Sequence, residues 1–510
     1  MVSWRTASVS LLSFSSGMPL GLVWIAIPDW MRSAGVDIRV VGLITLAQAP
    51  WSFKILWSPL MDRFVPPWLG RRRGWIAISQ VVLLGLTLAL AGLGDHPDLP
   101  WVVGALALAI AFASATHDIA YDAYAVDVLR PEEQGVAVGA KGGIYRAGMY
   151  IAGGFSITLA GTYSWPAVNV MLALLYLPML LVTWKAPEPP DTPAPPKTLR
   201  EAVWQPFLGF LSRHRALEIL AFVFFYKFAD NLAVALLRPF LVDMGYSDFD
   251  RGVALATVGL AAFMIGTFAG GVLTTPLGLG HSLWIFGFLQ VFSNIGYVLV
   301  ARSEVSPPLM YAATGFDNAA SGLGSGAFSV LLLRITQKRF SATQYAFFSS
   351  LFGLPRVLTG PMTGFAVDAV GWEAFFWATL LAAVPGLILL HRFAPLGNRE
   401  PRFEAEAPRQ LIPFSRAQIA SRGVLWAVAG TGAAILGMAA LAALKAMRAQ
   451  REAGFDLVAG LAQVMSPPDI RGWLQIGGIL IFGLVVGLCA AAVSAARHGE
   501  GESVRDAPGA

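Results

Sequence analysis

The amino-acid sequence predicts an all-α polytopic membrane protein. Hydrophobic side chains make up 56% of its 510 residues and charged side chains only 13%, whereas soluble proteins carry about 25% charged residues. The apolar residues gather in windows of roughly 20, the length with which an α-helix crosses ~30 Å of hydrocarbon. The basic residues lie in the short connections between these windows, so the net charge of +5 reflects membrane topology rather than a nucleic-acid partner.

Fourteen apolar segments can be drawn along the chain. The first is longer than the apolar core of a signal peptide and has no small-residue cleavage site, so it is predicted to be the first span. Six segments precede a proline-rich linker, six follow it, and two more follow a second linker. Their expected bounds are 7–30, 40–60, 74–93, 101–126, 135–161, 165–184, 218–241, 252–277, 281–301, 307–333, 342–367, 371–392, 422–445 and 472–495.

The loops differ strongly in their content of Lys and Arg. With a cytoplasmic N-terminus, the inner loops among the first thirteen spans hold nineteen of these residues. The outer loops over that stretch hold four, namely Arg32, Arg39, Arg251 and Arg302. Basic loops stay on the cytoplasmic side, so both termini are predicted to be cytoplasmic. The last outer loop departs from the rule, because it carries Lys445, Arg448, Arg451 and Arg471.

Two linkers divide the chain into predicted domains. Residues 185–217 begin with KAPEPPDTPAPPK, a proline-rich spacer between expected six-helix bundles at 1–184 and 218–392. Residues 393–421 form a second, charged linker before two additional helices at 422–495, and 496–510 are expected to be a disordered tail. Six plus six spans around a long cytoplasmic linker is the layout of a major facilitator. It predicts two pseudo-symmetric halves with a binding site between them near the midplane.

Charged residues cluster where the second, third and fourth spans are expected to end at the cytoplasm. The cluster consists of Asp62, Arg63, Arg71, Arg72, Arg73 and Asp127. Acids and arginines at neighbouring helix ends can pair and so lock the inward gate. Plain positive-inside topology is the alternative, and it explains the arginines but not the acids. The matching loop of the second half, TTPLGLGHS, lacks these charges, so the lock is expected in one half only.

The fourth span carries His117, Asp118 and Asp122 in an otherwise apolar helix. An unpaired carboxylate there costs several kcal/mol, so these side chains are expected to face the bundle interior or to be protonated. Axial distances along the helices allow Asp118 to pair with Arg146 and Asp122 with Lys141. Such pairs can be purely structural, but carboxylates that exchange a partner with a solute or a proton also suit proton coupling. A lone histidine is more often a packing residue than a proton carrier.

The second half carries fewer ionisable residues. Lys227 and Asp230 lie three positions apart and can simply neutralise each other. Asp317 and Asn318 lie near the middle of the tenth span, and Arg356 lies in the eleventh. Cations in a cavity would attract carboxylated solutes.

Ionisable residues spaced through apolar helices indicate a solute transporter. An enzyme would need a nucleophile beside a base, or a metal cluster, and the spans contain no HExxH, His-Ser-Asp or cysteine-based motif. The single cysteine, Cys489, provides neither a disulfide nor a zinc site. A membrane sensor that binds a ligand without transporting it is the remaining alternative.

Several segments resemble the AmpG family of muropeptide permeases, which are proton-driven major facilitators of the bacterial inner membrane. The resemblance is carried by SFSSGMPLGL at 13–22, FKILWSPLMDRFVPPWLGRRRGW at 53–75, DIAYDAYAVDVL at 118–129, YRAGM at 145–149, YKFAD at 226–230, FSATQYA at 340–346 and VPGLILL at 384–390. It implies import of N-acetylglucosaminyl-anhydromuramyl peptides for peptidoglycan recycling by a monomer embedded in lipid. It further implies that the proton gradient drives transport without a cofactor, and in some bacteria a part in β-lactamase induction.

The residues and the resemblance together give two sets of candidates. The proton-coupling candidates are Asp118, Asp122, His117 and Asp317. The substrate-binding candidates offer cations to carboxylates and rings or amides to sugars, and they are Trp24, Gln48, Tyr121, Tyr145, Arg146, Tyr226, Lys227, Asp230, Asn231, Asn318, Gln344 and Arg356. The sequence departs from the family's pattern at His117, Lys141 and Pro355, so another large anion, such as acetyl-coenzyme A, stays open as the solute.

Overall fold

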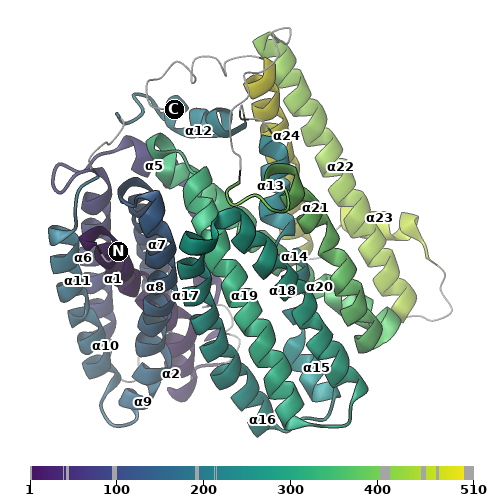
Figure 1. The fold of residues 1–510 in the computed structure, drawn as a ribbon, viewed down its shortest axis with the longest axis horizontal. Coiled ribbons are helices and arrows are strands. Elements are labelled where there is room, and N and C mark those ends of the chain that lie inside the picture. Colours follow the sequence, from purple (N-terminus) through teal and green to yellow (C-terminus); the bar gives the residue numbers. More distant parts are fainter. Residues whose placement is uncertain are drawn as a thin grey trace. The chain divides into compact units, whose positions relative to one another are not determined.

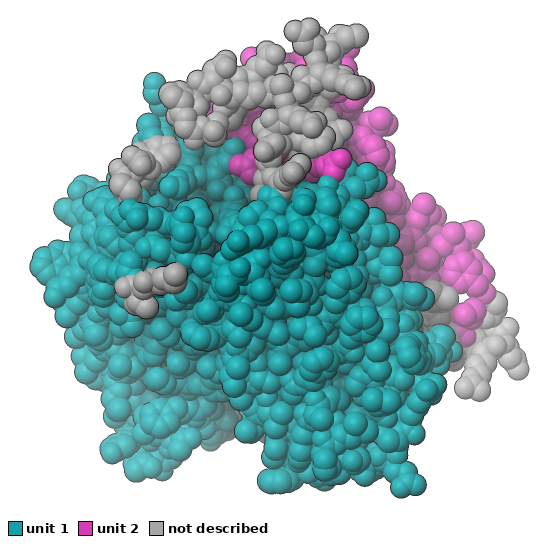
Figure 2. Space-filling model, in the orientation of Figure 1, with its two compact units in different colours: residues 1–203, 217–403 teal, residues 204–216, 404–510 magenta. Residues whose placement is uncertain are grey.

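The computed structural model describes residues 3–37, 40–41, 45–94, 100–189, 194–211, 213, 215–401, 414–449, 455–466 and 470–498. All regular elements in these ranges are helices, as predicted (Figure 1). The chain forms two compact units, which Figure 2 distinguishes by colour. Unit 1 comprises residues 1–203 and 217–403, and unit 2 comprises residues 204–216 and 404–510.

In the first half of unit 1, the third and fourth predicted spans are single long helices, and the other four are built from shorter pieces. Prolines lie in the first turn of α4, α5, α8 and α10, where their missing N–H group costs no hydrogen bond. The elements are α1 (Trp4–Gly21), η1 (Leu22–Ala26), α2 (Ile27–Ser33), η2 (Thr45–Gln48), α4 (Ala49–Phe53), η3 (Lys54–Leu56), α5 (Ser58–Arg63), α6 (Arg71–Ala91), α7 (Pro100–Val128), α8 (Pro131–Tyr150), η4 (Ile151–Phe155), α9 (Ser156–Ala160), α10 (Trp165–Leu174) and α11 (Tyr176–Lys185).

The second half of unit 1 follows the linker helix α12 (Leu199–Leu211). The continuous element α20 contains a sharp break at Gly371, whose φ of 80° is readily adopted by glycine. The break separates the predicted eleventh and twelfth spans. The elements are α13 (Ala216–Phe225), α14 (Phe228–Val234), α15 (Leu237–Asp243), α16 (Asp248–Gly252), η5 (Val253–Val258), α17 (Gly259–Leu277), α18 (Leu279–Arg302), α19 (Pro307–Ile335), η6 (Lys338–Phe340), α20 (Ser341–Ala382) and α21 (Val384–Phe393).

Unit 2 contains α22 (Arg416–Ala449), α23 (Leu457–Met465) and α24 (Ile470–His498). Glycines let α22 and α24 approach closely, because a Cβ atom on Gly487 would lie 2.6 Å from the carbonyl oxygen of Gly423. The expected tail falls largely on residues 499–510, which lie outside the described residues, as do residues 402–413 of the second linker.

Ten of the described helices are long and apolar enough to span a membrane, or eleven if one bent helix pair counts as a span. The predicted second span is divided into short helices and includes residues 42–44, which lie outside the described ranges. The predicted fifth span begins with α8, whose glycines and charged residues lower its hydropathy. The number of fourteen spans therefore stays a prediction.

The two halves of unit 1 touch most closely where α8 lies against α17. A Cβ atom on Gly135 would lie 2.5 Å from the carbonyl oxygen of Gly271, and one on Gly139 would lie 2.6 Å from that of Phe268. Only glycine permits such backbone contact. We call this end of unit 1, where α8 begins and α17 ends, the gate end.

The halves diverge along α8 toward its other end. There the guanidinium group of Arg146 lies 4.3 Å from the ring centroid of Phe263 on α17, so side chains rather than backbones make the contact. One turn farther, Tyr150 lines a cavity of about 490 Å³ with residues of α15, α16 and η5. We call this the open end. Figure 2 shows a notch in unit 1 between its lower lobes.

Candidate functional site

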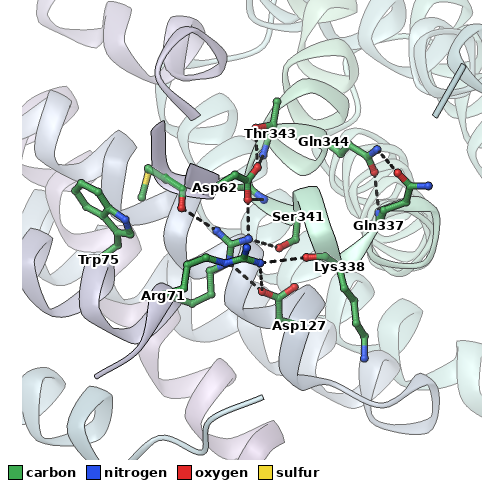
Figure 3. A network of polar contacts seen from close by, with 12 residues as sticks. Asp62, Arg71, Trp75, Asp127, Gln337, Lys338, Ser341, Thr343 and Gln344 are labelled. Carbon is green, nitrogen blue, oxygen red and sulfur yellow. Dashed lines mark hydrogen bonds and ion pairs between the residues drawn. The ribbon is translucent and has the colours of Figure 1, made fainter. Parts of the chain in front are cut away.

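The gate end is closed by a buried network around Arg72, at the start of α6. Arg72 donates a hydrogen bond to Asp62 of α5 at 2.7 Å and another to Asp127 of α7 at 2.9 Å. Its guanidinium group also donates to the hydroxyl of Ser341 at 2.7 Å. All four residues are buried, and Ser341 belongs to the other half (Figure 3). The predicted pairing among the acids and arginines of the first half is confirmed for these three charged residues.

Asp62 also caps a helix of the opposite half. Its carboxylate accepts hydrogen bonds from the backbone N–H groups of Ala342 at 3.3 Å and Thr343 at 2.8 Å, and from the Thr343 hydroxyl at 2.6 Å. The first N–H groups of a helix lack partners within it, and a negative charge there is stabilised by the helix dipole. One carboxylate thus supplies the N-terminal cap of α20 and joins the halves.

The remaining arginines of the predicted lock have different roles. Arg71 lies 4.0 Å from Asp127 and donates to the carbonyl oxygen of Lys338. Arg73 pairs with Glu188 of the linker at 2.9 Å, and Arg63 donates to the carbonyl oxygen of Lys197. Arg63 and Arg73 therefore contact the linker rather than the acids of the network, and their part in the gate stays a prediction.

Gln344 also lies at the gate end, one turn into α20. Its amide group donates to the side-chain oxygen of Gln337 at 2.8 Å and accepts from the Gln337 backbone N–H at 2.8 Å. In this arrangement Gln344 stabilises the loop between α19 and α20 (Figure 3), whereas the sequence predicted it to bind substrate.

Between the gate and the open end, Asp122 of α7 lies between two lysines. Lys141 of α8 is 2.6 Å from one carboxylate oxygen, and Lys54 of η3 is 3.7 Å from the other. The predicted pairing of Asp122 with Lys141 is confirmed, and Lys54 is an addition that the sequence reasoning missed. Asp118, one turn away on α7, also interacts electrostatically with both lysines, so the cluster carries a surplus positive charge only when one of the two carboxyl groups is protonated.

The lysine–aspartate cluster connects both halves through aromatic rings. The Lys141 ammonium group lies 4.7 Å from the ring centroid of Tyr121 and 5.9 Å from that of Tyr345 on α20. An ammonium group is attracted to the face of an aromatic ring within about 6 Å. Since Tyr345 follows Thr343 by two residues, the cluster lies next to the gate.

Asp118 and His117 belong to a chain of polar groups inside the first half. Ser16 of α1 donates a hydrogen bond to Asp118. Ser15 lies 3.1 Å from Nε2 of His117 and accepts from Gln80 of α6 at 3.2 Å. All of these side chains are buried. The predicted ion pair between Asp118 and Arg146 was wrong, because Asp118 is held by a hydroxyl group while Arg146 lies over Phe263.

The second half contains a buried cluster built on α14. The Lys227 ammonium group lies 3.0 Å from Asp230, and it donates to the carbonyl oxygen and the hydroxyl of Ser321 at 2.9 and 3.1 Å. The Ser321 hydroxyl also donates to Asp230 at 2.8 Å. Lys227 and Asp230 therefore neutralise each other in this state, which was the plainer of the two interpretations.

Asp317 is almost fully buried in α19 and is held by two hydroxyl groups of α18. Ser293 donates to one carboxylate oxygen at 2.8 Å, and Tyr297 donates to the other at 3.0 Å. Among the described residues, no Lys, Arg or His forms an ion pair with it. Two hydroxyl donors without a cation can hold either the ionised or the protonated carboxyl group, so the geometry suits a proton site.

Two tyrosines predicted to stack on sugars form hydrogen bonds with the backbone of the protein instead. The hydroxyl of Tyr121 donates to the carbonyl oxygen of Val9, and that of Tyr226 donates to the carbonyl oxygen of Leu283. Both rings are buried, and Tyr226 stacks on Phe328 with centroids 5.3 Å apart. Neither ring is open to a solute in this state, and their part in substrate binding stays a prediction.

The remaining candidates lie at the walls of the bundle. Asn231 and Asn318 each donate to the carbonyl oxygen four residues earlier, which leaves their own side-chain oxygens available. Trp24 is 43% exposed and packs edge-on against Trp51. Tyr145 and Gln48 are partly exposed. The side chain of Arg356 lies outside the described residues.

Sequence reasoning missed the partners that position these charged groups. They are mostly hydroxyl-bearing residues from distant segments, namely Ser15, Ser16, Ser293, Tyr297, Ser321, Ser341 and Thr343. A signal existed for two of them, Ser341 and Thr343, because hydroxyl residues after a loop often mark the start of a helix. Among the described residues, no group of three or more His, Cys, Asp and Glu side chains could hold a metal ion.

The chain is similar to several known transporters. The pattern of the Major Facilitator Superfamily matches residues 9–358. The anhydromuropeptide permease of Escherichia coli strain K12 is 41% identical over 388 residues, which are 76% of this chain and 79% of that one. The putative transporter AmpG 4 of Rickettsia felis is 28% identical, over 76% of this chain and 96% of that one.

Solved structures share the fold at low sequence identity. The human organic anion transporter MFSD10 (TETRAN) gives a TM-score of 0.56 at 14% identity, over 76% of this chain and 99% of that one. A bacterial homologue of the iron transporter ferroportin gives 0.58 at 12% identity, over 77% and 99%. With its two packed halves and its permease relatives, the chain belongs to the AmpG family of the Major Facilitator Superfamily and is a multi-pass membrane transporter.

Proposed function

We propose that the protein imports anhydromuropeptides into the cytoplasm in symport with protons. The observation that carries the proposal is the 41% identity to a named anhydromuropeptide permease over three-quarters of the chain. The cluster of Lys54, Asp122 and Lys141 supports it, because its two ammonium groups can bind carboxylates of a peptide stem when a carboxyl group of the cluster takes up a proton.

The proposal assigns the gate end to the cytoplasm and the open end to the periplasm. The loops at the gate end carry most of the basic residues, and such loops stay inside. In the described state the Asp62 network closes the cytoplasmic side, while the cavity beside Tyr150 faces the periplasm. The proposal therefore has the solute enter the space between the halves from the periplasm.

Proton coupling is assigned to the buried carboxylates of both halves. Asp122 can exchange a lysine partner for a proton when the solute's carboxylate takes that lysine. Asp118 and Asp317, held by hydroxyl groups rather than cations, can carry a proton without breaking an ion pair. Proton release from these carboxyl groups would be coupled to the gate through Tyr345, whose ring centroid lies 5.9 Å from the Lys141 ammonium group and which follows Thr343 by two residues.

Uptake by proteoliposomes tests the proposal. The purified chain should accumulate labelled N-acetylglucosaminyl-anhydromuramyl tripeptide when the outside is made acidic, and a protonophore should abolish accumulation. Unlabelled anhydromuropeptide should compete, whereas acetyl-coenzyme A should not. Competition by acetyl-coenzyme A alone would assign a different large anion, and binding without uptake would identify a sensor.

A further inference from the structure

The cavity at the open end is a second place where a solute can bind. It has a volume of about 490 Å³, which falls within the 300–1,000 Å³ typical of small-molecule sites. Its walls come from both halves of unit 1, with Tyr150 on one side and α15, α16 and η5 on the other. None of its lining residues belongs to the buried clusters around Asp122, Asp230 or Asp317.

The charges that line this cavity are predominantly positive. Arg238 and Arg251 both face it, together with Asp248. Arg251 is fixed in place, because it donates to the carbonyl oxygen of Tyr246 and pairs with Asp248. Arg238 is exposed, and no carboxylate in the described part of the chain forms an ion pair with it. Two guanidinium groups therefore face one carboxylate, and planar guanidinium groups bind carboxylates through paired hydrogen bonds.

The opposite wall offers an aromatic ring. The Tyr150 side chain is 38% exposed, unlike the buried rings of Tyr121 and Tyr226. An exposed ring presents an apolar face to the apolar face of a sugar, with a hydroxyl group at its edge for hydrogen bonding. The cavity thus combines a site for carboxylates with a site for a sugar ring.

Cationic side chains continue from the cavity toward the gate along α8. Arg146 precedes Tyr150 by one helical turn and lies over Phe263, and Lys141 lies deeper, paired with Asp122. Residues four apart lie on one face of a helix, so Tyr150 and Arg146 present adjacent surfaces. An anion bound in the cavity lies at the outer end of this row of positive charges.

We propose that the cavity is an outer capture site for the anionic glycopeptide. Arg238 and Arg251 bind carboxylates of the peptide stem, and Tyr150 packs against a sugar ring, before the solute moves inward to Lys141 and Lys54. The proposal rests on the function proposed above and adds residues that determine capture. It predicts that Arg238 affects the solute concentration needed for uptake and not the maximal rate.

The test is uptake by the full chain in proteoliposomes with Arg238→Gln, Arg238→Lys and Arg251→Gln variants. Arg302→Gln is the matched control, because Arg302, the last residue of α18, is also an exposed helical arginine at this end but pairs with Glu373 and does not line the cavity. Arg238→Gln should raise KM about 5-fold with kcat unchanged, and Arg238→Lys should restore most of the loss. The difference in KM between Arg238→Gln and the unmodified chain should become smaller in high salt, because salt screens exposed charges.

Competitors separate the two parts of the site. Free stem peptide should inhibit uptake less well in Arg238→Gln than in the unmodified chain. The free disaccharide should inhibit less well in Tyr150→Ala, while Arg302→Gln should behave like the unmodified chain towards both competitors. If Arg238→Gln and Arg302→Gln both transport with equal KM, the capture site is overturned and the proposed function is not. Absence of uptake by the unmodified chain would instead overturn the proposed function.

Discussion

At the scale of single residues, Asp62 makes the contacts that connect the two halves at the gate end. It is buried and accepts hydrogen bonds from Arg72 in its own half and from two N–H groups and one hydroxyl in the other. A carboxylate in such a position is stabilising only while all donors remain in place, because a buried charge without partners is costly. The residue therefore favours the closed gate and is expected to resist partial opening.

Replacing Asp62 with Asn should open the gate end. The neutral side chain loses the charge-assisted bonds to Arg72 and to the start of α20, and we expect the closed gate to lose about 3 kcal/mol, a shift of roughly 100-fold in population. Reaction of a cysteine introduced at the buried Ala342 with a water-soluble maleimide should become much faster, in a chain in which Cys489 is replaced with Ser.

Arg63→Gln is the matched control for this change. Arg63 is adjacent in sequence but donates only to the carbonyl oxygen of Lys197 in the linker, so maleimide reactivity should stay at the level of the unmodified protein. Equal reactivity in Asp62→Asn and Arg63→Gln would contradict the role of Asp62 as the cap that joins the halves.

A second prediction at this scale concerns Asp122. Among the described residues, Asp122 is the only carboxylate that forms ion pairs with Lys141 and Lys54. Asp122→Asn therefore removes the proton site but leaves both lysines to bind a carboxylate of the solute. Exchange of labelled for unlabelled solute across the membrane should continue, but accumulation driven by a pH gradient should fall at least ~10-fold. Full gradient-driven accumulation by this variant would place proton coupling elsewhere.

At the scale of elements, α8 determines how the halves meet. Its first turns carry Gly135 and Gly139, which touch the backbone of α17. Its last turns carry Arg146, which lies over Phe263, and Tyr150, which lines the cavity at the open end. The change from glycine to large side chains along a single helix produces a close contact at one end and divergence at the other. Since glycines allow helices to slide past each other at short range, the same surface permits rocking of the halves.

Gly139→Val should prevent the gate end from closing. A Cβ atom at this position would lie 2.6 Å from a backbone oxygen of Phe268, which cannot move without displacing α17. We expect uptake to fall at least ~10-fold while the protein still folds, because each half keeps its own core. Uptake rate, with thermal unfolding as the check on folding, measures the effect.

Gly143→Ala provides the control on the same helix. A Cβ atom there would meet nothing within 4 Å, so uptake should stay close to that of the unmodified chain. An equal loss of uptake in both variants would mean that the glycines of α8 are needed for flexibility of the helix and not for its contact with α17.

The sequence predicts these elements more successfully than their contacts. Hydropathy predicts the helices, and the charged loops predict the acids of the gate. Both signals depend only on local composition, which the sequence shows directly. The partners of the buried charges come from distant segments, and periodicity says nothing about which helices meet. Asp62 was expected to pair with arginines, yet it also caps α20, 280 residues away. Tyr121 and Tyr226 were expected to face the solute, but their hydroxyls bind backbone carbonyls.

At the scale of the whole molecule, unit 1 is a pair of helical halves that are joined at one end and separated at the other. The connection consists of the Asp62 network and the glycine contacts of α8 with α17. Both are polar or small-residue contacts. Such a contact can be broken and reformed at a cost of a few kcal/mol, which is the range that ligand binding can supply. The molecule is therefore suited to alternate between two openings.

The measurement that tests this account most directly is a pair of inter-half distances in the reconstituted protein, obtained by spin labelling after replacing Cys489 with Ser. One pair of labels, at Trp68 and Lys338, spans the gate end, and the other, at Tyr163 and Phe249, spans the open end. Without solute the account predicts a short gate-end distance and a long open-end distance. Anhydromuropeptide at acidic pH should lengthen the first and shorten the second in the same molecules. Two distances that stay constant, or that lengthen together, would contradict it.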